Sequence, residues 1–185
     1  MKHLKDTKLK NLLTAAMFLA IGLLLPFLTM QMQKTGNMLL PMHIPVMLCG
    51  LICGWQYGLA VGFILPLLRS FLFGMPVLYP SAVSMAFELA TYGFVSGFLY
   101  SRSKYRCLKA LYRCMITAMI SGRIVWGVTQ AILLGFGGDF TFSAFIAGAF
   151  LNAIPGIILQ LILIPVIMVS LKRAKFVSLS KKYDK

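Results

Sequence analysis

The sequence predicts an all-α integral membrane protein, a bundle of six transmembrane helices with both termini in the cytoplasm. Three observations lead to this prediction. Apolar residues make up 59% of the 185-residue chain. Several apolar runs are long enough to cross a hydrocarbon core of about 30 Å. Lys and Arg gather at the ends of these runs, as they do on the cytoplasmic side of membrane proteins, because cations are hard to translocate and anionic lipid attracts them.

The basic residues form three clusters, which a six-helix topology places on one side of the membrane. Lys34, Arg69 and Arg123 lie outside the clusters. The last two are inside apolar segments, where a charge is costly and usually functional. The clusters are Lys2, Lys5, Lys8 and Lys10; Arg102, Lys104, Arg106, Lys109 and Arg113; and Lys172, Arg173, Lys175, Lys181, Lys182 and Lys185.

Four stretches are clear helix candidates, and a fifth must be divided. The run 44–73 would be about 45 Å long as one helix, which is too long for the core without a steep tilt. If it crosses twice, as 44–54 and 57–73, all three basic clusters face the cytoplasm, so we expect a break within 54–58. The first span follows a basic start but lacks a signal-peptide cleavage site, and we expect it to be retained. The four clear candidates are 11–32, 82–101, 110–134 and 142–171.

Composition and motifs exclude several other classes of protein. A pI near 10.0 is common in nucleic-acid-binding proteins, but here the charge flanks apolar runs, so we expect membrane lipid and no nucleic acid as a partner. The four cysteines and two histidines lack metal-ligand spacing, and no glycine-rich phosphate loop is present. We therefore expect no metal and no cofactor. A single membrane domain is predicted, with a basic N-terminus (1–10), a helical bundle (11–172) and a basic tail (173–185).

Polar side chains within the spans fall on faces that would converge in the bundle interior, because contact with lipid is costly for them. Two arginines against one glutamate leave this interior net positive. An anionic ligand would neutralise it, and arginine offers a planar fork for a carboxylate. We expect an externally open site in which Arg123 first, or Arg69 second, receives a ligand carboxylate. Further candidate contacts are Glu88, Asn152, Gln130, Tyr79, Tyr92, Trp126 and His43.

Each feature also has a structural interpretation. Glu88 with either arginine would be an ion pair that fixes helix register. Trp126 and Tyr79 would be interface anchors. A stripe of small and polar residues at fourfold spacing in the sixth span, ending at Gln160, would be a close-packing surface.

Several segments resemble the substrate-binding (S) components of energy-coupling factor (ECF) vitamin transporters, and the resemblance covers about residues 11 to 172. Ala16 and Ala20 match the AxxxA surface by which S components dock on a coupling subunit. The other matching segments are Leu40–Val46, Gly54–Gly62, Phe73–Pro80 and Met85–Gly93.

The resemblance implies a six-helix S component in the bacterial plasma membrane that captures a small vitamin outside the cell. Delivery would follow when it docks on a transmembrane coupling subunit bound to two ATPase subunits, and the chain itself would have no catalytic site. Loops 31–42 and 74–80 would gate the site. The segments around Leu40 and Tyr79 are most similar to the pantothenate branch, with folate the closest rival and cobalamin, pyridoxine-type and queuosine-precursor branches also open.

An alternative from another class is an autonomous channel or secondary carrier. An ion-coupled carrier needs coupling carboxylates, and Glu88 is the single carboxylate within the predicted spans. A membrane enzyme has no support, because no buried Ser/His/Asp set or paired carboxylates are predicted.

Overall fold

The computed structural model describes residues 2–28, 41–103, 107–135 and 154–174, and all regular structure in these ranges is helical. Among these residues, five helices are long and apolar enough to cross a membrane, and α3 is a shorter apolar helix, which confirms the predicted all-α membrane bundle. The elements are α1 (Lys2–Leu28), α3 (His43–Cys53), α4 (Trp55–Phe73), the π-helical turn η1 (Leu78–Ala82), α5 (Val83–Arg102), α6 (Leu108–Leu134) and α8 (Ile154–Arg173).

The break inside the long apolar run lies at a single residue, Gly54. Its φ of 104° belongs to the left-handed half of backbone space, which side chains with a Cβ avoid. The predicted break extended to Gly58, but Gly58 lies inside α4. The division of 44–73 into two helices is therefore confirmed, and α4 begins earlier than expected, at Trp55.

The ends of the other predicted spans shift by differing amounts. The first helix begins at Lys2 and not at residue 11, so the N-terminal basic cluster is itself helical. The fourth and fifth spans match α5 and α6 within two residues at each end. The part of the sixth span before Ile154 lies outside the described residues.

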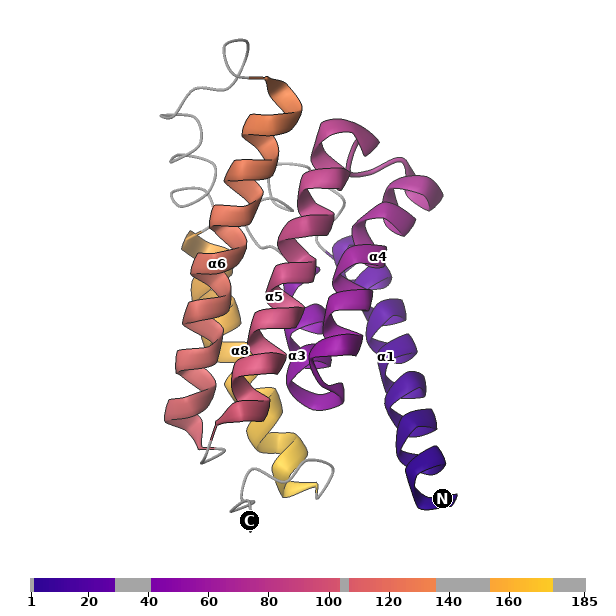
Figure 1. Ribbon diagram of the computed structural model, residues 1–185, viewed down its shortest axis with the longest axis vertical. Coiled ribbons are helices and arrows are strands. Elements are labelled where there is room, and N and C mark those ends of the chain that lie inside the picture. The colour runs from indigo at the N-terminus through magenta and orange to yellow at the C-terminus, as the bar shows by residue number, and fades with distance from the viewer. Residues whose placement is uncertain (1, 29–40, 104–106, 136–153, 175–185) are drawn as a thin grey trace.

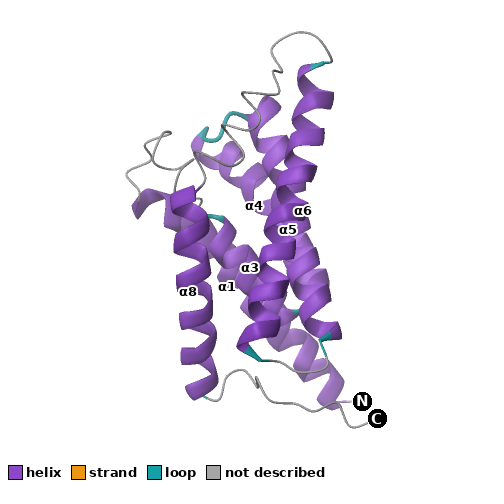
Figure 2. Ribbon diagram, turned by 90° about the vertical axis from the view of Figure 1, so that its left-hand side faces the viewer, coloured by secondary structure: helices purple, strands orange, loops and turns teal. Residues whose placement is uncertain are grey.

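The helices alternate in direction so that the basic clusters meet at one end of the molecule. The starts of α1 and α6 and the ends of α5 and α8 all lie at the lower end of Figures 1 and 2. Arg102 is in the last turn of α5, and Lys172 and Arg173 are in the last turn of α8. The chain path therefore agrees with the prediction that dividing the run 44–73 into two helices brings the three basic clusters to one side of the membrane.

Helices α3, α4 and α5 touch through bare backbone. A Cβ added to Gly58 would lie 2.6 Å from Cα of Gly50 and 2.7 Å from the carbonyl oxygen of Gly93. No side chain fits at such distances, so these glycines let three helices approach at one point. This is the close-packing role of small residues in membranes, and it makes α5 a fixed support for the side chains on its other faces.

Helix α1 is fastened to this unit by two polar contacts about three turns apart along the helix. The amide Nδ2 of Asn11 donates to the carbonyl of Cys53 at 3.4 Å, just before the Gly54 break. Near the C-terminal end of α1, Nη1 of Arg69 donates to the carbonyl of Leu23 at 2.9 Å. Between these contacts, α1 packs on α3 and α4 through Ala15 and Phe18, which are both buried.

Candidate functional site

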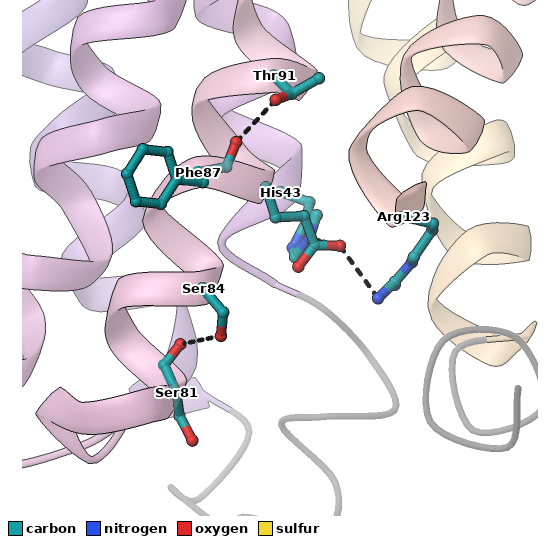
Figure 3. Close-up of polar contacts among 7 residues, drawn as sticks. His43, Ser81, Ser84, Phe87, Thr91 and Arg123 are labelled. Atoms are coloured by element: carbon teal, nitrogen blue, oxygen red, sulfur yellow. Dashed lines mark hydrogen bonds and ion pairs between the residues drawn. The ribbon is translucent and has the colours of Figure 1, made fainter. Parts of the chain in front are cut away.

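Three charged or titratable side chains from three helices meet in the interior. Oε1 of Glu88, on α5, lies 3.0 Å from Nη1 of Arg123 on α6 and 3.5 Å from Nε2 of His43 at the start of α3. Their exposed fractions are 2%, 5% and 0%. The dashed line to Arg123 in Figure 3 marks the ion pair. Because Glu88 pairs with Arg123, the ion pair anticipated from sequence forms across α5 and α6 and not with Arg69.

Arg123 uses only one edge of its guanidinium for this pair. Its Nε and Nη2 are buried and have no hydrogen-bond partner among the described residues. The Nε–H and one Nη2–H of arginine point in the same direction and form a fork that matches the two oxygens of a carboxylate. Glu88 on Nη1 therefore orients the guanidinium, while the Nε–Nη2 fork has no acceptor among the described residues.

Tyr92 sets the spacing between the helices that carry this cluster. Its ring packs edge-on against the ring of His43, with centroids 4.8 Å apart and an interplanar angle of 89°. On its other side the ring lies on Gly122, where an added Cβ would be 2.3 Å from Cε2. Gly122 directly precedes Arg123, so the bare backbone at this position lets Tyr92 bridge α3 and α6 beside the charged pair.

The hydroxyl residues one turn before and after Glu88 on α5 bond to the backbone of α5 itself or of the turn η1 before it. The hydroxyl of Ser84 donates to the carbonyls of Pro80 and Ser81, each at 3.0 Å, and the hydroxyl of Thr91 donates to the carbonyl of Phe87 at 2.8 Å. Figure 3 shows the Ser84–Ser81 and Thr91–Phe87 bonds apart from the His43–Arg123 cluster. Hydroxyls that bond to their own helix satisfy themselves locally, so Glu88 and Tyr92 carry the polar character of this face.

Arg69 has a different environment. Its side chain is 4% exposed, and its Cζ lies 5.4 Å from the ring centroid of Phe27 and 5.7 Å from that of Phe73. These two rings contact each other edge-on. Together with the bond to Leu23 on α1, this arrangement holds the ends of α1 and α4 together. The structure does not bring Arg69 into the Glu88 cluster.

The remaining candidate contacts that the structure describes lie on α6 and in the turn η1 before α5. Gln130 lies two turns beyond Arg123 on the same face of α6, about 10 Å along the axis, and its Oε1 is buried without a partner in the described ranges. Tyr79 is exposed, and its hydroxyl donates to the carbonyl of Leu133 at the end of α6. Trp126 is partly buried on α6. Asn152 lies outside the described residues.

Gln160 is a polar residue that sequence reasoning placed in a packing stripe and not among the ligand contacts. It is 1% exposed, and neither Oε1 nor Nε2 has a partner in the part of the chain that the structure describes. Burying an amide without a hydrogen bond is costly. The signal in the sequence was a lone amide within a strongly apolar helix, which marks Gln160 as a further candidate contact.

Two other features bear on partners and metals. Ala16 and Ala20 on α1 are both exposed, on the side away from α3 and α4. Within the described ranges, no three His, Cys, Asp or Glu side chains form a group that could hold a metal ion.

Comparison with known proteins places the chain in a family. Residues 10–168 match the family model described as "ECF transporter, substrate-specific component". No curated protein and no solved structure matches the chain.

Proposed function

The chain belongs to the family of substrate-specific components of ECF transporters, and on this premise we propose that it captures a small water-soluble vitamin with a carboxylate group on the outer side of the bacterial plasma membrane. The chain is a multi-pass membrane subunit of a transporter in this family. Pantothenate is the proposed ligand, with folate as the rival.

The observation that carries the proposal is the open fork of Arg123. Its Nε and Nη2 are buried donors without a partner among the described residues, while Nη1 is held by Glu88. A buried donor with no acceptor is costly, so a ligand carboxylate at this fork would recover that cost. A charge-assisted hydrogen bond contributes on the order of 1.5–3 kcal/mol.

The neutral part of the ligand would lie along α6 and α8. Gln130 and Gln160 offer amide groups on these two helices, and both have side-chain atoms that lack partners in the described structure. Pantothenate has one carboxylate, an amide and hydroxyls, which need one fork and a few neutral donors and acceptors. Folate would need a second cation for its second carboxylate, and Arg69, beside Phe27 and Phe73, is separate from this cluster.

Isothermal titration of the detergent-solubilised protein against pantothenate and its amide analogue tests the proposal. Arg123→Gln is expected to weaken binding of the acid roughly tenfold to several-hundredfold, and Arg123→Lys to recover only part of this, because a point charge lacks the fork. Arg69→Gln is the matched control and should lower the melting temperature while leaving the preference for acid over amide. Equal binding of acid and amide by the wild type would refute the carboxylate fork.

Identification of the ligand itself needs a measurement that does not presuppose it. Mass spectrometry of small molecules that co-purify with the protein is expected to detect pantothenate. Detection of folate in its place would retain the arginine fork and reject the pantothenate assignment.

Docking on the coupling subunit would use the exposed face of α1. Ala16 and Ala20 lie one turn apart, and small residues permit close approach of another helix. Ala16→Trp or Ala20→Trp is expected to abolish uptake in cells that carry the coupling and ATPase subunits, while binding to the isolated protein stays intact. Met17→Leu is the control, since Met17 is exposed on the same face of α1 and this change keeps the size of its side chain, so uptake should be retained. Loss of binding together with uptake would mean that the alanines support the fold.

A further inference from the structure

An aromatic stack that ends in an arginine covers one face of α4 and α5 at the basic end of the molecule. The ring of Trp55 packs edge-on against Phe94, with centroids 5.5 Å apart. Phe94 stacks on Phe98 at 5.5 Å and 15°. The guanidinium carbon of Arg102 lies 4.8 Å from the ring centroid of Phe98. These four residues, Trp55, Phe94, Phe98 and Arg102, are called the aromatic ladder below.

The backbone fixes the ladder in place. Phe94, Phe98 and Arg102 follow each other at fourfold spacing on α5, so they lie in one row about 12 Å long. A Cβ added to Gly97 would lie 2.8 Å from both Cα and N of Trp55. The start of α4 therefore rests directly on α5, which brings the indole of Trp55 against the row.

The ladder is open to its surroundings, although its residues contact one another. Trp55 is 38% exposed, Arg102 is exposed, and Phe94 and Phe98 are partly exposed. Arg102 belongs to a cluster of five basic residues, and the sequence has no acidic residue between Glu88 and Asp139 to neutralise it. A positive charge held over an aromatic face retains its outer N–H groups for an anion.

We propose that the aromatic ladder is a binding site for one anionic phospholipid of the inner leaflet, whose headgroup phosphate binds Arg102 and whose glycerol and upper acyl chains lie along Phe98, Phe94 and Trp55. Arginine binds phosphate through paired N–H groups. Tryptophan favours the boundary between headgroups and hydrocarbon. The charged end of the row lies at the basic end of the bundle, where the membrane surface is anionic. The row thus matches a phospholipid in both polarity and direction.

Quenching of Trp55 by brominated lipid tests this site directly. The chain has two tryptophans, so Trp126→Phe leaves Trp55 as the only indole. In phosphatidylcholine vesicles, phosphatidylglycerol with brominated acyl chains is expected to quench Trp55 at about a tenfold lower mole fraction than brominated phosphatidylcholine. Inorganic phosphate in excess should not reduce the quenching, because the acyl chains contribute to binding.

Two variants in this single-tryptophan protein separate a specific site from general surface charge. Arg102→Gln is expected to remove the preference for phosphatidylglycerol. Arg113 is also an exposed cation of this cluster, but it has no aromatic ring beneath it in the described structure. Arg113→Gln should therefore change the lipid preference by no more than about fivefold, which is the effect of removing one cation from near an anionic membrane surface. Phe98→Leu should weaken the preference while Arg102 remains, because the guanidinium loses its support.

Three results would overturn the proposal. Equal quenching by the two brominated lipids means that no anionic lipid is selected. Equal effects of Arg102→Gln and Arg113→Gln mean that only net charge matters. An unchanged lipid preference in Arg102→Gln, together with loss of assembly with the coupling subunit, would make the ladder a protein interface.

Discussion

Glu88 and Arg123 form a buried ion pair between α5 and α6 in which Oε1 of the glutamate lies 3.0 Å from Nη1 of the arginine. The pair is shared with His43, whose Nε2 lies 3.5 Å from the same oxygen. One carboxylate oxygen thus faces two potential cations, and the arginine retains an unused fork. The sequence left two roles open for Glu88: it could orient Arg123, or it could contact the ligand directly. In this arrangement the two roles predict different effects of a substitution.

Glu88→Gln distinguishes these roles. If Glu88 orients and neutralises Arg123, the variant leaves a buried cation without its counter-ion, which should lower the free energy of unfolding by about 3–5 kcal/mol. A carboxylate ligand would then supply the missing negative charge, so the ligand-induced rise in melting temperature should be larger than in the wild type. Thermal unfolding with and without pantothenate measures both effects. A smaller ligand-induced shift than in the wild type would mean that Glu88 contacts the ligand.

Gly122 is expected to control the position of the charged pair through Tyr92. Gly122→Ala places a Cβ 2.3 Å from Cε2 of Tyr92, and overpacking of this kind costs typically 1–3 kcal/mol. The ring would be pushed toward His43, so ligand affinity should fall together with the melting temperature. Ser121→Ala, one residue earlier, removes an exposed hydroxyl that donates to the carbonyl of Thr117, and it should have little effect.

A compensating substitution at Tyr92 tests whether the effect of Gly122→Ala comes from this one contact. Tyr92→Leu combined with Gly122→Ala should recover much of the stability lost in Gly122→Ala alone, because the smaller side chain leaves room for the added methyl group. The double-mutant cycle measures this coupling, which is expected to lie within the usual 0.5–3 kcal/mol for residues in contact. Additive losses would mean that Gly122 matters for another neighbour.

The sequence was sufficient for the helical bundle because hydropathy and charge act at the level of whole segments. The division of 44–73 into two helices was predicted from the need to place the basic clusters on one side and from the glycines in the run. In the structure the helix is interrupted at Gly54. An ion pair between Glu88 and an arginine was also predictable, because a charge within a membrane needs a partner. The choice of arginine was not, since it depends on which faces of α4 and α6 turn toward α5.

The least predictable features depend on backbone atoms and on close approach. Arg69 donates to the carbonyl of Leu23, and any residue could provide that acceptor. Gly122 looks like one more small residue in a membrane helix until the ring of Tyr92 is found against it. His43 precedes the second span in the sequence, and only the fold brings it to Glu88. Such contacts arise from tertiary packing and leave no periodic pattern in the chain.

Cys107 provides a native reporter for the orientation of the bundle. It is exposed at the turn between α5 and α6, whereas Cys49, Cys53 and Cys114 are buried. If the basic end is cytoplasmic, a membrane-impermeant maleimide should not label the wild type in intact cells but should label it in inverted membrane vesicles. Val77→Cys, in the exposed loop at the opposite end, should give the reverse pattern in a Cys107→Ser background. Labelling of Cys107 from outside intact cells would invert the proposed topology.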